Sequence, residues 1–366
     1  MTTAVHSGRS RTVNAGTYAV RIADGLRAEF AWRIAETAPA HCYAVITDDQ
    51  VAPFYAHELV DGLAARGRAS LHVMPAGEAH KTRDSWSRLT DELIAAGCAR
   101  DTTVVALGGG VVGDLAGFVA ATFMRGVPVV QCPTSLLAMI DASVGGKTGV
   151  DTKAGKNLVG AFHAPAVVLA DVGMLATLPM AHRRAGLAEA IKHGVIADAS
   201  YFDELDASLT ALLACDPAAT LDAVTRSVEI KSSVVQSDPR EHGLRKTLNF
   251  GHTLGHAIEQ ASGYALLHGE CVAIGMVLEA RLAENLGVAE RGMAVKIERI
   301  LERAGLSAKR PASLGAEAVL AATRLDKKSR GGVVEYALPA RIGAMANAGS
   351  SWSVAVGDAA VLEVLA

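Results

Sequence analysis

The sequence predicts an α/β domain with a mostly parallel sheet, followed by an all-helical domain. Two observations predict this fold class. Short apolar runs alternate with helical patterns up to about residue 178, whereas from about residue 181 to 320 the patterns are long, helical and rich in alanine. Strand and helix alternating in this rhythm form a parallel sheet with helices on both faces. Because 366 residues exceed one ordinary hydrophobic core, we expect two domains, residues 1–180 and 181–366.

Five apolar runs predict the strands, and each is closed within two residues by aspartate, glycine or proline, which favour turns. The runs are residues 43–46, 70–74, 102–107, 129–132 and 166–170. Helical patterns such as residues 84–97 lie between several of them. Ligands of such sheets bind at the carboxyl ends of the strands. We therefore expect the site at that edge, in a cleft between the two halves of the chain.

The second half shows few strand signals. The helical patterns are residues 184–195, 220–236, 271–286 and 294–304. Near the end of the chain, residues 333–338 and 342–345 are apolar and short, and we expect them to form a hairpin.

Composition excludes several classes of protein. Half of the residues are apolar and a fifth are charged, which excludes intrinsic disorder. The 35 basic and 38 acidic residues give a net charge of −3, which disfavours nucleic-acid binding. The most apolar long window, residues 104–123, contains an aspartate and five glycines, which disfavours a membrane span.

The expected location is the cytoplasm. The five cysteines are odd in number and far apart, as is typical of thiols in a reducing compartment. Residues 1–16 are polar and lack the apolar stretch of a secretory signal. We expect neither a membrane nor a nucleic acid among the partners.

A glycine-rich turn follows the third predicted strand. Gly108, Gly110 and Gly113 match G-x-G-x-x-G and precede a helical pattern, so the backbone there could approach a pyrophosphate at a helix N-terminus. No acidic residue stands about 20 positions further on, but Asp48, at the end of the first predicted strand, could hold a ribose hydroxyl. A tight strand-to-helix turn without a ligand explains this motif about equally well.

Two familiar motifs are excluded. Residues 145–148 resemble the end of a nucleoside-triphosphate loop, but Asp141 stands where that loop requires glycine. His252 and His256 are spaced as in His-Glu-x-x-His proteases, but position 253 is threonine.

The helical pattern over residues 184–195 contains a charged pair, Glu189 and Lys192. The pattern is apolar on more than one side, so we expect a buried helix. In an exposed helix the pair would be an ordinary surface ion pair. In a buried helix it requires a partner or a metal.

Lys231 interrupts an apolar stripe formed by Leu221, Val224, Val228 and Val235. The simpler interpretation, and the one we favour, is that its side chain extends to the rim of the buried surface. The functional alternative is that it holds a buried anion.

Metal-ligating residue types gather in the second half. His252 and His256 lie on one face of a helix if the helix has begun by His252. His268 follows, and together with Glu189 these residues offer ligands for a first-row metal. Catalytic zinc takes three protein ligands and leaves a position open for water or substrate. Such a site binds a hydroxyl or carbonyl oxygen.

Basic residues recur in or near these motifs, in a chain whose net charge is negative. They are Arg125, Lys147, Lys156, Lys192, Lys231, Arg245 and Lys327. Lys327 belongs to residues 326–328, which are either solvated charge or a segment that closes over an anion. If the basic residues converge, the ligand is a small polyanion such as a phosphate that also carries a carboxylate.

In order and spacing, the motifs resemble those of the 3-dehydroquinate synthase family of sugar-phosphate cyclases. The resemblance extends from about residue 47 to 328. It rests on PAGEAHK at 75–81, GGGVVGD at 108–114, PTSLLAMIDASVGGKTG at 133–149, GKNLVGAF at 155–162, GLAEAIK at 186–192, LNFGHTLGH at 248–256 and HGE at 268–270.

The resemblance implies a Rossmann-like NAD-binding domain, an all-α metal-binding domain and a homodimer. It implies NAD and zinc, or cobalt, as cofactors. The reaction it implies converts 3-deoxy-D-arabino-heptulosonate 7-phosphate to 3-dehydroquinate and phosphate in the shikimate pathway of aromatic amino acid biosynthesis. This reaction proceeds by oxidation with NAD, β-elimination of phosphate, reduction and an intramolecular aldol, without net redox change.

The resemblance also assigns roles to residues. The metal ligands it implies are Glu189, His252 and His268. The NAD contacts it implies are Asp48, Glu78, Lys81, Gly110, Val111, Val112, Gly113, Asp114, Thr134, Ser135, Lys147, Lys156 and Thr177. The substrate contacts it implies are Arg125, Asp141, Lys147, Lys156, Asn157, Lys192, Lys231, Arg245, Asn249, His256 and Lys327.

Among these, we expect His256 to relay a proton at the oxidised hydroxyl, and Asp141 to orient the region of Lys147. The residues that would hold phosphate and carboxylate are Lys147, Asn157, Lys192, Lys231 and Lys327. The residues counted as catalytic are Asp141, Lys147, Asn157, Lys192, Lys231 and His256. Ala76 and Ser135 depart from the family pattern, which often has Asp and Thr there. Both departures concern NAD affinity and leave the reaction unchanged.

Three alternatives remain open. A related cyclase of secondary metabolism would make aminodehydroquinate or an inosose, and residues 145–148 disfavour the inosose and valiolone branches. A metal-dependent NAD polyol dehydrogenase would need fewer lysines. A non-enzymatic sugar-phosphate sensor would not need the full set of metal and hydride partners.

Overall fold

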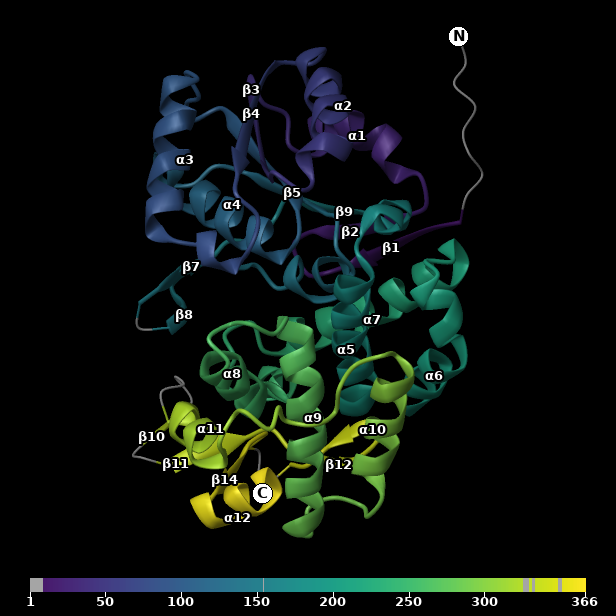
Figure 1. The fold of residues 1–366 in the computed structure, drawn as a ribbon. Coiled ribbons are helices and arrows are strands. Elements are labelled where there is room, and N and C mark those ends of the chain that lie inside the picture. The colour runs from purple at the N-terminus through teal and green to yellow at the C-terminus, as the bar shows by residue number, and fades with distance from the viewer. Residues whose placement is uncertain (1–8, 154, 325–328, 331–332, 348–350) are drawn as a thin grey trace. The chain divides into compact units, whose positions relative to one another are not determined.

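The computed structural model describes residues 9–153, 155–324, 329–330, 333–347 and 351–366 (Figure 1). By their contacts the residues form two compact units, Met1–Leu178 with Pro217–Ser232 and Pro179–Asp216 with Ser233–Ala366. The segment Pro217–Ser232 therefore groups with the first unit, whereas the sequence analysis placed it in the second domain.

A seven-stranded sheet forms the centre of the first unit, in the order β1-β2-β9-β6-β5-β3-β4. Its strands are β1 (Ser10–Asn14), β2 (Ala19–Ala23), β3 (Cys42–Asp48), β4 (Arg68–Met74), β5 (Thr102–Gly108), β6 (Val129–Pro133) and β9 (Val167–Asp171). All neighbours pair in parallel except β1 with β2. The five strands predicted from apolar runs are confirmed, and the mostly parallel sheet with them.

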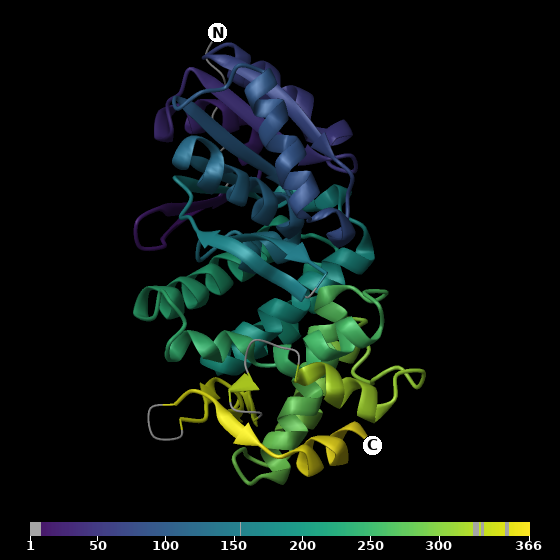
Figure 2. The same ribbon diagram turned by 90° about the vertical axis from the view of Figure 1, so that its left-hand side faces the viewer.

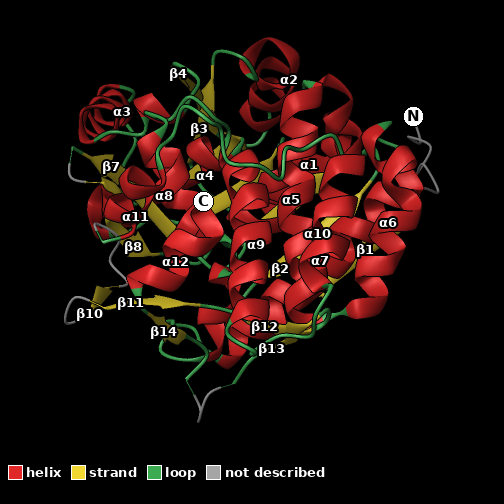
Figure 3. Ribbon diagram, turned by 60° about the horizontal axis from the view of Figure 1, so that its bottom comes forward, coloured by secondary structure: helices red, strands yellow, loops and turns green. Residues whose placement is uncertain are grey.

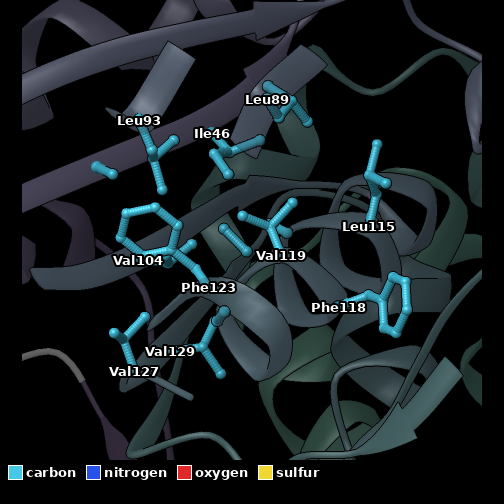
Figure 4. Packing of buried hydrophobic residues seen from close by; sticks show 14 of the residues in the cluster. Ile46, Leu89, Leu93, Val104, Leu115, Phe118, Val119, Phe123, Val127 and Val129 are labelled. Atoms are coloured by element: carbon cyan, nitrogen blue, oxygen red, sulfur yellow. The ribbon is translucent and has the colours of Figure 1, made fainter. Parts of the chain in front are cut away.

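Helices cover both faces of this sheet. They are α1 (Phe30–Thr37), α2 (Ala52–Ala64), α3 (Arg83–Ala95) and α4 (Gly110–Thr122). Every second residue of β3, including Ala44 and Ile46, points into a core that α3 and α4 complete with Leu89 and Leu115 (Figure 4). Helices α1 and α2 contact each other and cover the opposite face (Figure 1). Burial of both faces explains why the strands read as continuous apolar runs.

The chain changes direction between β3 and β5. These two strands are neighbours, yet the connection after β3 leads to β4 on one side and the connection after β5 leads to β6 on the other. Such a switch point opens a crevice at the carboxyl ends of the two strands, where ligands of α/β sheets bind.

A π-helical turn and a hairpin follow β6 in the first unit. The hairpin pairs β7 (Lys147–Thr152) with β8 (Gly155–Phe162), and β7 packs against α4. The π-helical turn, Ala138–Ala142, precedes the hairpin and contains Asp141. Turns of this kind are frequent at functional sites.

The second unit is mainly helical (Figure 3). Its helices are α5 (Met180–Ala197), α6 (Ala199–Leu213), α8 (His252–Ala261), α9 (His268–Asn285), α10 (Met293–Arg303), α11 (Ala316–Thr323) and α12 (Asp358–Leu365), while α7 (Pro217–Ser237) begins in the first unit. Residues 185–196 of α5 are buried on every side, which confirms the expected buried helix, whereas Arg184 is exposed. Among the helices that the structure describes, none is long and apolar enough to cross a membrane.

The second unit also carries short strands, so the expectation of an all-helical half is wrong in detail. They are β10 (Ser329–Arg330), β11 (Val333–Tyr336), β12 (Pro339–Arg341), β13 (Ala344–Met345) and β14 (Val354–Val356). Strand β14 leads into α12, which lies beside α9 (Figure 2).

The predicted pairing of residues 333–338 with 342–345 is also wrong. Strand β11 pairs with β10 and β14, whereas β13 pairs with β12. The turn at Ile342 and Gly343, where Gly343 has a φ of 85°, returns the chain directly onto β12. The strand that pairs with β13 is therefore β12, which lies between the two apolar runs, in residues that the prediction treated as the turn.

Candidate functional site

Most of the residues that the sequence analysis assigned to NAD lie after the carboxyl ends of five parallel strands of the first unit, whereas Lys147 and Lys156 lie in the hairpin of β7 and β8. Asp48 ends β3, and the remaining groups follow β4, β5, β6 and β9. They are Glu78 with Lys81, Gly110–Asp114, Thr134 with Ser135, and Thr177. Because the carboxyl ends of parallel strands share one edge, the sheet brings these dispersed residues to the edge where ligands bind.

The glycine-rich turn joins β5 to α4 in close contact with its surroundings. A Cβ at Gly108 would lie 2.6 Å from Val112, and one at Gly110 would lie 3.1 Å from the Cβ of Ala142. No side chain caps the N-terminus of α4 at Gly109. Its first backbone N–H groups therefore remain available to an anion, and the positive end of the helix dipole favours one.

Asp48 and Thr177 are held by local hydrogen bonds. The Asp48 carboxylate accepts from the backbone N–H of Gln50 at 3.0 Å and of Val51 at 2.9 Å. Thr177, the last residue of the 3-10 helix Val172–Thr177, shares a hydrogen bond of 2.8 Å with the hydroxyl of Tyr55. Both side chains are thus fixed at the edge of the sheet.

Lys81 is the centre of a charged cluster. Only 3% exposed, its Nζ lies 2.7 Å from Glu78, 3.3 Å from Asp114 and 3.7 Å from Asp151. Burial raises the pKa of Asp114 to about 6, although Lys81 counteracts this shift. Burial also opposes ionisation of Glu78, but Lys81 and Lys156 outweigh it and lower the pKa of Glu78.

Lys231 lies within the first unit and is not at a rim. It is 7% exposed, and its Nζ lies 2.8 Å from the Oδ1 atom of Asp141 and 2.5 Å from the Asp141 backbone oxygen. The favoured interpretation, extension of the side chain to solvent, is therefore wrong. The side chain of Asp141 pairs with Lys231, whereas we expected it to orient the region of Lys147.

The remaining polar candidates of the first unit lie on its turns and hairpin. Arg125 and Asn157 have positive φ angles of 71° and 53°, a backbone conformation that non-glycine residues seldom adopt. Asn157 donates its N–H to Asp151 at 2.8 Å, and Lys156 lies 3.2 Å from Glu78. Lys147 begins β7 with an exposed side chain.

In the second unit, three helices bring the predicted metal ligands together. Glu189 of α5 is 1% exposed, and its Oε1 lies 3.4 Å from the Nε2 atoms of both His252 and His268. His252 is the first residue of α8, and His268 is the first residue of α9. The ring nitrogens of His252, His256 and His268 lie within 4.8 Å of one another.

In His252 and His268, the second ring nitrogen has an acceptor of its own. The Nδ1 of His252 lies 3.1 Å from the backbone oxygen of Phe250, and the Nδ1 of His268 lies 3.6 Å from Glu259. Ligating histidines in metal sites are oriented in this way, since an Nδ1–H held by an acceptor leaves the Nε2 lone pair for the metal. The donor set therefore fits zinc or a similar cation.

Burial and nearby charges set the ionisation of this cluster. Burial lowers the pKa of His252 to about 3, and Lys192 adds to the effect. Burial also acts to lower the pKa of His268, but Glu189 and Glu259 raise it to about 9. Burial opposes ionisation of Glu189, yet Lys192, with which it forms an ion pair, and His252 hold its pKa well below its usual range.

Comparison with known proteins decides the family. The model of the 3-dehydroquinate synthase N-terminal domain matches residues 71–185, and that of the C-terminal domain matches residues 186–329. The 3-dehydroquinate synthase of Xanthomonas campestris pv. campestris is 48% identical over 359 residues, which cover 95% of each chain.

The chain belongs to the 3-dehydroquinate synthase family. Its relatives place it among the phosphate-eliminating cyclases of the shikimate pathway.

Solved structures share the 3-dehydroquinate synthase-like fold. A 2-epi-5-epi-valiolone synthase from Streptomyces hygroscopicus subsp. jinggangensis, with NAD⁺ and Zn²⁺ bound, has a TM-score of 0.85 and 30% identity over 98% of both chains. A 2-deoxy-scyllo-inosose synthase, complexed with carbaglucose-6-phosphate, NAD⁺ and Co²⁺, has a TM-score of 0.88 and 24% identity, covering 98% of this chain and 99% of its own.

The other substrate candidates of the family pattern lie in the second unit. Arg245, within the 3-10 helix Leu244–Asn249, is 2% exposed and donates from its guanidinium to the backbone oxygen of Pro239 at 2.7 Å. Asn249 donates its side-chain amide to Glu241 at 2.6 Å. Lys192 and His256 lie beside the metal-ligand cluster. Lys327 lies outside the described residues.

Three carboxylates around these 3-dehydroquinate synthase motifs were not found from the sequence. Asp151 pairs with Lys81 and accepts the N–H of Asn157. Glu259 lies beside the Nδ1 of His268, and Glu279 accepts the N–H of Gly251 before α8. Glu259 could have been found, because it falls near the helical face of His252 and His256. Asp151 and Glu279 gave no local signal, since their partners are distant in sequence.

Proposed function

We propose that the chain converts 3-deoxy-D-arabino-heptulosonate 7-phosphate to 3-dehydroquinate and phosphate, using NAD and a divalent metal held by its own residues. The observation that carries this proposal is the approach of Glu189, His252 and His268 from three helices, within a chain of this family. When bound, NAD would take up and return a hydride, and zinc or cobalt would lower the pKa of a ligated substrate hydroxyl.

The first unit supplies the NAD site in this proposal. The uncapped N-terminus of α4 would bind the pyrophosphate, because its N–H groups and dipole favour an anion. Asp48 at the end of β3 would accept from a ribose hydroxyl, as the switch point between β3 and β5 favours. Thr134, Ser135 and Thr177 would complete the polar edge.

The second unit supplies the metal site. Glu189, His252 and His268 would bind the cation, and this leaves His256 beside the cluster for proton transfer at a substrate hydroxyl. The ion pair of Lys192 with Glu189 keeps that carboxylate ionised, which metal binding requires. Lys192 itself would also face the anionic substrate.

Basic and amide side chains that the family resemblance assigns to the substrate would bind its phosphate and carboxylate. The residues are Arg125, Lys147, Lys156, Asn157, Lys192, Lys231, Arg245, Asn249 and Lys327. Three of them, Lys192, Lys231 and Arg245, are nearly buried, so each carries a desolvated charge that an anion would stabilise. The ion pair with Asp141 would keep Lys231 in place before substrate binds.

The closest competing substrate is the amino analogue that yields aminodehydroquinate. Relatives at 48% identity carry the 3-dehydroquinate synthase name, and this favours the heptulosonate phosphate. The test measures kcat/KM for both substrates with saturating NAD and zinc. Preference for the heptulosonate phosphate supports the proposal, and preference for the amino analogue overturns the substrate assignment while leaving the metal site intact.

Two further properties follow from the family resemblance and are proposed here. They are a homodimeric assembly and a cytoplasmic location. Sedimentation equilibrium of the purified chain tests the first, with a mass of twice 37.8 kDa expected. A monomer at assay concentration would contradict it.

A further inference from the structure

Glu279 is a fully buried carboxylate on α9, and both of its oxygens accept backbone N–H groups from the start of α8. Its Oε2 accepts from Gly251 at 2.7 Å, and its Oε1 accepts from Leu254 at 2.9 Å. The side chain thus spans the first turn of the helix that begins at His252.

The charge of Glu279 suits this position. The first N–H groups of a helix have no partner within the helix, and the helix dipole makes that end positive. Gly251 is the residue before α8, has a φ of 77° and offers no side chain to cap the helix. A carboxylate from the neighbouring helix therefore takes the place of a local N-cap.

The same helix also begins with a proposed metal ligand. His268 is the first residue of α9, and Glu279 lies further along it. Helix α9 therefore contributes one proposed ligand directly and orients the turn that carries another, His252. The two helices approach so closely that a Cβ at Gly275 would lie 2.0 Å from the backbone oxygen of Gly251.

We infer that Glu279 is a positioning residue for the metal centre, acting through the first turn of α8 to hold the ring of His252 toward Glu189. This inference rests on the proposed metal site. When the groups that orient metal ligands are removed, the affinity of the site for its metal falls by roughly 10- to 100-fold. The loss arises because the unbound ligands no longer start from the geometry that the metal requires.

The chain contains a matched control. Glu284 lies on the same helix and accepts the N–H of Ala294 at 2.7 Å, at the start of α10. Helix α10 also follows a glycine with positive φ, Gly292 at 85°, but carries no candidate site residue. Removal of the Glu279 charge weakens the cap of α8, and removal of the Glu284 charge weakens the cap of α10. Only α8 carries a proposed metal ligand.

The experiment measures zinc affinity by competition with a chromophoric chelator, in E279Q, E284Q and the wild type, with thermal unfolding and far-UV circular dichroism of the same samples. We expect E279Q to bind zinc roughly 10- to 100-fold more weakly, with unchanged helix content, and E284Q to bind zinc like the wild type. Equal zinc affinity in E279Q and the wild type would overturn the inference, as would an equal loss in both variants.

Two further variants keep the test decisive. H252A separates the inference from the metal site itself. If H252A binds zinc as the wild type does, the proposed metal site is wrong. If H252A loses zinc but E279Q binds it as the wild type does, the metal site stands and only the inference about Glu279 is wrong. E279D retains the negative charge, but its side chain is shorter and cannot reach the N–H groups of both Gly251 and Leu254. We expect its zinc affinity to fall between those of E279Q and the wild type, and wild-type affinity in a folded E279D protein would count against the inference.

Discussion

Lys231 and Asp141, 90 residues apart in the sequence, form a largely buried ion pair, with the lysine Nζ 2.8 Å from the carboxylate and 2.5 Å from the backbone oxygen of the same residue. Asp141 lies in a π-helical turn and Lys231 in the part of α7 that belongs to the first unit. The pair holds the lysine ammonium group in a fixed and largely desolvated position, where we propose that it binds an anionic group of the substrate.

Replacement of Lys231 by methionine should therefore reduce both stability and activity. Removing one partner of a buried pair leaves an uncompensated charge, which costs about 3 kcal/mol of unfolding free energy. Loss of an anion contact should lower kcat/KM by roughly 30-fold or more. Denaturant unfolding and steady-state kinetics measure the two effects.

Arg226 provides the control for this variant. It forms an exposed ion pair with Glu229 on the same helix. Because exposed pairs contribute about 0–1 kcal/mol, R226M should change neither quantity appreciably. Full activity in K231M would show that the pair only stabilises the fold.

Metal binding should depend on His252. H252A should lose zinc and lose activity with it, by roughly 10³-fold or more, because the metal contributes several kcal/mol to charge stabilisation. Metal analysis after gel filtration and an activity assay of the same fractions test this. H182A, which changes an exposed histidine of α5, should retain both. An H252A protein that is active and loaded with metal would refute the ligand assignment.

The glycine-rich turn should be sensitive to a single methyl group. A Cβ at Gly110 would approach Ala142 at 3.1 Å and would project from the first residue of α4. G110A should therefore weaken NAD binding by about 10-fold, roughly 1.4 kcal/mol, as measured by isothermal titration calorimetry. G315A places the same methyl group before another helix, where nothing lies within 4 Å. Unchanged NAD affinity in G110A would argue that the turn serves packing alone.

Asp114 should make stability depend on pH. Burial raises its pKa from 3.8 to about 6. A carboxyl group whose folded pKa is raised contributes stability that is complete below pH 4 and is lost as the pH rises through 6. Asparagine does not titrate, so the unfolding free energy of the wild type minus that of D114N should fall by about 2–3 kcal/mol between pH 4 and pH 7. A difference that is constant or rises with pH would contradict this assignment.

The fold was predictable wherever burial imposed a pattern. Strands β3, β5 and β9 are covered on both faces, so their apolar runs are continuous. Strand β1 was not predicted, because four of its five residues are exposed and it lies at the edge of the sheet, paired only with β2. Strand β8 was not predicted either, because its side chains are mostly exposed and form no apolar run.

The site was predictable where ligand types recur at helical spacing, as with His252 and His256. It was not predictable where a partner comes from a distant segment. The apolar stripe of α7 showed that Lys231 interrupts a buried face, but only the fold supplies Asp141 as its partner. Glu279 likewise gave no signal in the sequence, because only the fold places its partner Gly251 beside it.

The measurement that tests the central claim most directly follows phosphate release, 3-dehydroquinate formation and NADH absorbance together, with substrate in large excess over NAD. The sample is assayed as purified, after chelation and after zinc is restored. The account predicts many turnovers per NAD with no net NADH, activity lost on chelation and recovered with zinc. Net accumulation of NADH, or no product from folded, zinc-loaded protein, would contradict it.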